Sequence, residues 1–176
     1  MCHDANWWGK TKEMLTLENV IKKMPNVHFY WAGDGQYKGP ILEKFEKYEN
    51  FHYLGTLGYP DEVRQYLTEI DIYALPTGMD TTPLSCREAM AMKKPIIGTR
   101  VGGIPEMIYD KKTGCLVNEG DDKAWIESIE LILNDKKLAE KFGNNARDLL
   151  LEKFNWDVVA KKFLVAAESV LQKRVK

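Results

Sequence analysis

The sequence predicts a doubly wound α/β domain built on a parallel sheet (Rossmann-like). Short β-branched and aromatic runs alternate along the chain with helical stretches of about ten residues. Such alternation produces right-handed βαβ units, whose parallel strands are covered by helices on both faces. Ligands of these sheets bind outside the carboxyl ends of the strands. Loops that follow strands are therefore where a functional site is expected.

The expected strands are short, apolar and bounded by glycine, proline or asparagine. They cover residues 27–32, 51–54, 70–75, 95–98 and 114–117. The expected helices show apolar residues at helical spacing, or begin at a proline followed by good helix formers. They cover residues 11–24, a segment opened by Gly39-Pro40, a segment opened by Pro60, a segment from Leu84 or Ser85 to Met92, and three closing helices at 121–133, 136–151 and 156–172.

Length, charge and cysteine content narrow the class of protein. With 176 residues and no internal repeat or linker, residues 1–176 are expected to form one domain. A net charge of −1 gives no electrostatic case for nucleic acid. Cys2, Cys86 and Cys115 lack metal-ligand spacing, so neither disulfides nor a zinc site is expected. No apolar run reaches the ~20 residues of a membrane span. A cytoplasmic protein is expected, with membrane association only through a missing partner.

The most informative stretch runs from Met79 to Pro105. Asp80 precedes a loop that ends at Pro83, where a helix is expected to begin, and Glu88 lies about one turn into that helix. The free N–H groups at such a helix end bind phosphate or sugar oxygens, and carboxylates accept from vicinal hydroxyls. The combination predicts a ligand with phosphate in the middle and hydroxyls on both sides, as in a nucleotide sugar. The alternative is that Asp80 caps the helix and Glu88 is merely solvated.

Glycines follow several of the other expected strands. Gly33-Asp34-Gly35, Gly55 and Gly102-Gly103 should share the sheet edge that carries Asp80. The Gly33-Asp34-Gly35 loop allows close approach of the backbone to a ligand, although such a sequence also forms a simple tight turn.

The order of these features resembles the C-terminal half of GT-B glycosyltransferases, specifically the large family 4 of retaining enzymes (glycosyl transferases group 1). The resemblance is carried by the loop Ala32-Gly33-Asp34-Gly35, by the acid-x7-Glu motif within TPLSCREAMAMKKPII, and by the GGIPE turn from Gly102 to Glu106. It covers the chain from about Lys10 to the final helix. The run from Asp80 to Glu106 is specific, whereas the glycine loop alone is weak.

The resemblance implies a role for each matched residue. Glu88 would bind ribose hydroxyls, Asp80 would lie near hydroxyls of the transferred sugar, and Lys10, or Lys12 in an alternative register, would neutralise the diphosphate. The implied catalytic set is therefore Asp80, Glu88 and Lys10. The implied donor-binding set is Gly33, Gly35, Leu54, Thr82, Leu84, Ser85 and Glu88, with Leu54 and Tyr53 beside the base and the N–H groups of Leu84 and Ser85 on the diphosphate. No cofactor and no metal is implied, because protein charge and helix dipoles stabilise the leaving group.

The sequence departs from the family pattern in three respects. The first acid is Asp80 where the family usually has glutamate, and no arginine occurs before Arg64 to accompany Lys10. The strand expected before Lys10 is also missing, together with the N-terminal acceptor-binding domain. The chain is thus interpreted as the donor-binding domain of a retaining glycosyltransferase, with little activity alone. The alternative is a non-catalytic nucleotide-sugar binding module, or the donor subunit of a two-chain transferase.

Other functional readings have less support. Ser85 lacks the nucleophile-elbow context of a serine hydrolase. The sequence contains no GxGxxG loop, which a dehydrogenase or an epimerase would need. The histidines have no carboxylate or nucleophile at a spacing that would indicate catalysis. Glu106 is expected either to cap the short helix after Pro105 or to contact the ligand. Trp7 and Trp8 are expected to be exposed, as the remainder of an interface with another domain. Trp125 and Trp156 are expected to be packing residues of the closing helices.

Overall fold

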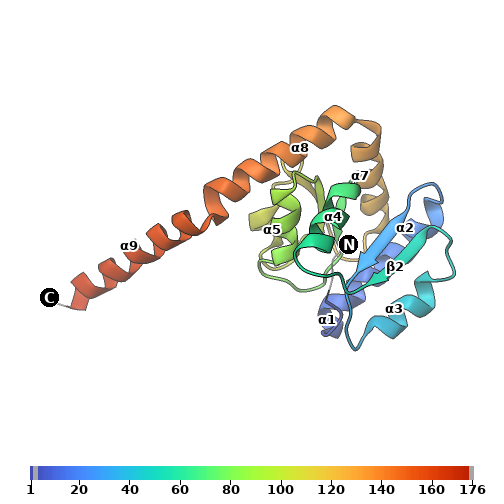
Figure 1. The fold of residues 1–176 in the computed structure, drawn as a ribbon, viewed down its shortest axis with the longest axis horizontal. Coiled ribbons are helices and arrows are strands. Elements are labelled where there is room, and N and C mark those ends of the chain that lie inside the picture. The colour runs from blue at the N-terminus through green and yellow to red at the C-terminus, as the bar shows by residue number, and fades with distance from the viewer. Residues whose placement is uncertain (2–3, 175–176) are drawn as a thin grey trace.

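The computed structural model, which describes residues 1 and 4–174, confirms an α/β fold with parallel strands (Figure 1). The strands are short and largely buried. They are β1 (Phe29–Ala32), β2 (Phe51–Gly55), β3 (Tyr73–Leu75), β4 (Ile96–Thr99) and β5 (Gly114–Val117).

Helices precede, separate and follow these strands. They are α1 (Trp8–Thr11), the 3₁₀ segment η1 (Lys12–Thr16), α2 (Leu17–Lys23), α3 (Lys38–Phe45), α4 (Asp61–Glu69), α5 (Leu84–Ala91), α6 (Ile104–Met107), α7 (Asp122–Asn134), α8 (Lys136–Leu149), the π-helical turn η2 (Leu150–Phe154) and α9 (Trp156–Arg174). Aspartates define where α7 and α8 begin. The side chain of Asp121 accepts from the N–H of Ala124, and that of Asp135 from the N–H of Leu138.

The strands form two parallel ladders in the described part of the chain, which corrects the expectation of one sheet. β1 pairs with β2, and a separate three-stranded sheet has the order β3-β4-β5. β3 is also shorter than the expected strand at 70–75, and β1 is shorter than that at 27–32. The missing portions of both strands border the gap between the ladders, where no neighbouring strand supplies hydrogen bonds.

Two clusters of buried apolar side chains lie against the strands. One gathers residues of η1, α2, α3 and α7 around β1 and β2, and the other gathers residues of α4, α5, α6 and α8. Consecutive residues of β4 serve both clusters, with Ile97 in the first and Ile96 in the second. The three-stranded sheet is therefore covered on both of its faces, as the doubly wound prediction requires.

The ends of the chain differ from expectation. Helical structure begins at Trp8, earlier than the predicted start at Thr11, and becomes 3₁₀ over η1. At the other end, α9 runs away from the rest of the molecule and does not close over it (Figure 1). Trp125 is fully buried as expected, but the prediction that Trp156 packs is wrong, because its side chain is 81% exposed. Trp7 and Trp8 are exposed, as expected, although Trp8 contacts the ring of Tyr37.

Candidate functional site

The loop that carries Asp80 is held in place by a pair of glycines. A Cβ on Gly102 would lie 2.0 Å from the backbone oxygen of Asp80, and one on Gly103 would lie 2.2 Å from that of Thr81. The N–H of Gly103 donates to the Asp80 oxygen at 3.1 Å. Only glycine permits this approach, so the turn after β4 determines where the backbone of Asp80 lies.

The Asp80 carboxylate faces Lys10. Lys10 Nζ lies 3.0 Å from Asp80 Oδ2, and the two side chains are only 20% and 12% exposed. Asp80 Oδ1 accepts from the N–H of Thr81 at 2.9 Å. Oδ2 is buried and, despite the nearby ammonium, has no hydrogen bond of good geometry within the described residues. This oxygen retains the capacity to accept from a further donor.

Lys10 reaches Asp80 because its helix docks on the loop after β3. The N–H of Gly78 donates to the Lys10 oxygen at 3.0 Å, and a Cβ on Gly78 would lie 2.3 Å from the oxygen of Gly9. Glu13, which is 5% exposed, accepts from the N–H of Gly120 at 2.9 Å. Burial raises the pKa of Glu13 despite that hydrogen bond. These contacts anchor α1 and η1 to loops that lie far along the chain.

The N-terminus of α5 is uncapped. The helix begins at Leu84, as predicted, and follows Pro83, whose extended backbone ends the preceding loop. Pro83, the residue at the cap position, makes no side-chain hydrogen bond to the first turn of this helix. The N–H groups of Leu84 and Ser85 therefore have the orientation and the partial positive charge that favour an anion. Leu84 and Thr82 have exposed side chains, and Ser85 is half-buried.

Glu88 lies one turn into α5 and is half-buried. Burial raises the pKa of its carboxyl group above the ordinary value. No hydrogen bond or ion pair to its side chain occurs within residues 1 and 4–174 that offsets this cost. Partial burial of a carboxylate without a donor destabilises the folded protein, which is typical of a group that serves a ligand.

The glycine loop after β1 is engaged mainly by the protein itself. Gly33 and Gly35 both have positive φ, at 146° and 150°. The N–H of Gly33 donates to the oxygen of Gly55, and its own oxygen accepts from Tyr53 Oη. A Cβ on Gly35 would lie 2.4 Å from the backbone of Ala5. The close approach inferred for Gly35 is therefore made by Ala5, a partner that the sequence pattern did not reveal.

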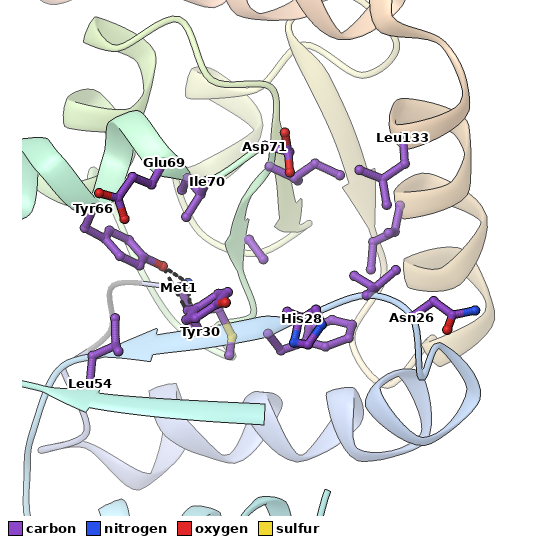
Figure 2. Close-up of a pocket in the computed structure, with 15 residues that line it drawn as sticks. Met1, Asn26, His28, Tyr30, Leu54, Tyr66, Glu69, Ile70, Asp71 and Leu133 are labelled. Atoms are coloured by element: carbon purple, nitrogen blue, oxygen red, sulfur yellow. Dashed lines mark hydrogen bonds between the residues drawn. The ribbon is translucent and has the colours of Figure 1, made fainter. Parts of the chain in front are cut away.

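The structure brings together some of the predicted residues and separates one from them. Lys10 and Asp80 are in direct contact, and Lys12 is exposed with its Cε near Gly78. Leu54 instead lines a cavity between β1 and β3 (Figure 2), which none of the other predicted site residues borders. Sequence reasoning missed Gly78 and Gly120, because a lone glycine gives no sign of the chain that will pack against it.

The described residues contain neither a membrane-spanning helix nor a cluster of metal ligands. No helix there combines the length and apolar character needed to cross a bilayer. No group of three or more His, Cys, Asp or Glu side chains there could hold a metal ion. Cys86 and Cys115 are buried free thiols, and Cys2 and His3 lie outside the described residues.

Solved structures share this fold. The C-terminal domain of a glycosyl transferase group 1 family protein (LpcC) from Francisella tularensis matches with a TM-score of 0.74 and 21% identity, over 88% of this chain and 85% of that one. Anabaena Alr3699/HepE in complex with UDP matches with a TM-score of 0.81 and 17% identity, over 96% of this chain and 48% of that one. The fold is that of the C-terminal domain of GT-B glycosyltransferases.

Sequence comparison places the chain within a family. The model for glycosyl transferases group 1 matches residues 11–149, so the chain belongs to that family. It is 32% identical to sulfoquinovosyl transferase SQD2 of Arabidopsis thaliana over 157 residues, 88% of this chain and 30% of the relative. It is 31% identical to N-acetyl-alpha-D-glucosaminyl L-malate synthase of Bacillus anthracis over 141 residues, 80% of this chain and 37% of the relative. The chain thus spans about a third of the length of these relatives.

Proposed function

We propose that this chain is the donor-binding domain of a retaining glycosyltransferase that uses a nucleoside-diphosphate sugar. Acceptor binding would belong to polypeptide outside this chain, which is consistent with the share of its relatives that the chain spans. The relatives are named as transferases and synthases, and Alr3699/HepE was crystallised with UDP. These names favour an enzyme over a non-catalytic binding module.

The observation that carries the proposal is the arrangement around Asp80. A buried oxygen without a hydrogen-bond donor, the Lys10 ammonium and the uncapped start of α5 all belong to one region of the carboxyl sheet edge. The ammonium and the N–H groups of Leu84 and Ser85 suit a diphosphate. The Asp80 oxygen suits a sugar hydroxyl that donates to it. These groups provide charge stabilisation for a departing nucleoside diphosphate with no metal.

Glu88 completes the proposed site from the same helix. Its half-buried carboxylate, whose pKa burial raises, is suited to accept from two neighbouring ribose hydroxyls. Binding would then supply the hydrogen bonds that the carboxylate lacks in the free protein. Gly33, Gly35 and Thr82 would border the donor, whereas Leu54, which lines the separate cavity between β1 and β3, is left out of the proposed site.

Calorimetric titration of the domain with UDP, GDP and ADP tests the proposal. We expect one diphosphate to bind, and Glu88→Ala to weaken it about tenfold or more, equivalent to roughly 1.4 kcal/mol. Glu130→Ala, at an exposed glutamate of α7, is the matched control and should bind as the parent does. Equal binding by the Glu88 and Glu130 variants, or no binding of any diphosphate by the folded protein, would contradict the donor site.

A further inference from the structure

Trp7 presents a largely uncovered indole ring next to the candidate site. Its side chain is 66% exposed, whereas Trp31 and Trp125 are fully buried. Its indole N–H has no hydrogen-bond acceptor within residues 1 and 4–174. Covering a large apolar ring is favourable, so the ring and its free donor are both available to a ligand.

The backbone of Trp7 is fixed by the helix that carries Lys10. Trp7 is the N-cap residue of α1, and its oxygen accepts from the N–H of Lys10 at 3.1 Å and from that of Thr11 at 2.9 Å. Residues three apart are neighbours on the surface of a helix. Trp7 therefore lies on the side of α1 from which Lys10 reaches Asp80, at 3.0 Å between Nζ and Oδ2.

Trp8 differs from Trp7 because its ring already has a partner. The centroids of the Trp8 and Tyr37 rings are 5.7 Å apart. Residues two apart on a helix do not face the same way, so Trp8 lies away from the side of α1 that carries Lys10. Of these two adjacent tryptophans, Trp7 is therefore the one directed to the candidate site.

Two more exposed apolar side chains flank the polar groups of the site. Met79, which precedes Asp80, is 56% exposed, and Leu84, the first residue of α5, is 71% exposed. The loop of Met79 is held against α1, because a Cβ on Gly78 would lie 2.3 Å from the oxygen of Gly9. Apolar side chains from α1, from this loop and from α5 thus border the polar groups, a combination typical of sites for small molecules.

A pyranose ring has the chemistry that matches this combination. Its hydroxyls lie around the edge, where a carboxylate can accept from them, and its faces carry C–H groups with a slight positive charge. The face of an indole is negative and attracts such groups. Stacking also buries apolar surface of both rings, and the indole N–H can donate to an oxygen at the edge of the sugar.

We propose that Trp7 stacks on a pyranose ring that is bound beside Asp80, with Met79 and Leu84 at the border of the same site. The inference rests on the proposed donor site and adds a residue that contributes to affinity for a sugar and not for the nucleoside diphosphate. Two pyranoses meet at such a site, the transferred sugar of the donor and the sugar of a glycan acceptor. Both present the same chemistry to the indole, and the experiment separates them.

NMR spectra of the tryptophan indole N–H groups in the whole chain test the proposal. Loss of a signal in Trp7→Ala identifies the signal of Trp7. The probes are UDP, GDP and ADP, their esters with glucose, galactose, mannose and N-acetylglucosamine, and the methyl glycosides of the same four sugars. We expect the Trp7 signal to shift with at least one ester or methyl glycoside, and the diphosphates to leave it in place.

Calorimetry measures the contribution of the ring to affinity. Trp7→Ala should weaken binding of the sugar ligand about fivefold, which is the size of a stacking contact between rings, and leave the diphosphate unchanged. Trp7→Phe keeps an aromatic face and should lose less. Trp156→Ala removes an indole that is 81% exposed on α9, and it is the matched control that should bind as the parent does.

The outcomes separate this inference from the donor site. A shift with an ester alone assigns the transferred sugar, and a shift with a methyl glycoside alone assigns the acceptor; either supports stacking. A Trp7 signal that ignores every sugar, or an equal loss of diphosphate and sugar affinity in Trp7→Ala, would overturn stacking even where a diphosphate binds. Absence of diphosphate binding would contradict the donor site alone, since methyl glycosides added without a nucleotide still report on Trp7.

Discussion

Lys10 Nζ and Asp80 Oδ2 form a 3.0 Å ion pair that joins the first helical segment to the loop after β3. In the free protein, the cation proposed for the diphosphate is therefore paired with the anion proposed for the sugar. Ligand binding would replace this pairing, because the diphosphate presents more negative charge to Lys10 and the sugar presents a donor to Asp80.

Replacement of Lys10 tests its share of diphosphate binding. Lys10→Ala should weaken UDP or whichever diphosphate binds about tenfold or more, roughly 1.4 kcal/mol, because a largely buried charge-assisted contact is lost. Calorimetry measures the change. Lys23→Ala removes a lysine that pairs with Asp122 at 3.3 Å on a more exposed surface, and it should leave affinity unchanged. Equal affinities for the two variants would remove Lys10 from the site.

Asp80→Asn tests whether Asp80 contributes to binding of the sugar and not of the diphosphate. The substitution keeps the size of the side chain and removes the charge that holds Lys10. We expect affinity for the nucleoside diphosphate to stay the same or rise, and affinity for the matching nucleotide sugar to fall relative to it. Competition of the two ligands measured by calorimetry gives the ratio. An equal loss for both ligands would place Asp80 away from the sugar.

The raised pKa of Glu88 has a consequence for stability. Because burial raises the pKa in the folded state, the folded protein binds more protons than the unfolded chain just above the ordinary pKa of 4.5. Stability is therefore lost as pH rises through this window, and the cost persists at pH 7. Glu88→Gln should raise Tm at pH 7 and have less effect near pH 4, while it weakens ligand binding.

Thermal unfolding at the two pH values checks this expectation. Glu130→Gln, at an exposed position of α7, is the control for removal of one negative charge. A lower Tm for Glu88→Gln than for Glu130→Gln at pH 7 would mean that the Glu88 carboxylate is stabilised by contacts in the free protein.

Gly103→Ala tests whether the turn after β4 positions Asp80. The new Cβ would lie 2.2 Å from the oxygen of Thr81, so the loop has to shift. Overpacking of this kind costs about 1–3 kcal/mol of stability, and diphosphate affinity should fall as well. Gly39→Ala is matched, because a Cβ there meets nothing within 4 Å. Unchanged stability and affinity for Gly103→Ala would contradict this role.

Sequence patterns predicted the helices and strands whose boundaries depend on only a few neighbouring residues. The start of α5 after Pro83 and the extent of β5 agree with expectation, because proline geometry and a short apolar run act over a few residues. The prediction of a single sheet is wrong, because a strand forms ladder hydrogen bonds only where another strand lies beside it. Residues 70–72 have strand composition, but the cavity between β1 and β3 lies where a partner strand would be. The prediction that Trp156 is a packing residue is wrong, because α9 extends away from the rest of the molecule.

The sequence indicates which residues could belong to the candidate site, but it does not indicate how these residues are arranged. The sequence indicated Lys10 and Asp80 separately, yet their contact depends on Gly78, which lets α1 approach the loop after β3. Gly35 was assigned to ligand approach, whereas its lack of a side chain makes room for Ala5. Contacts between distant segments leave no local signal, since any small residue is compatible with a turn.

The 19 residues of α9 also set a length scale. At 1.5 Å per residue the helix is about 28 Å long, close to the diameter of a small domain. Its exposed apolar residues include Phe163, Leu164, Val165 and Leu171. The exposed apolar surface of this chain therefore extends beyond η2 by about the width of a small domain.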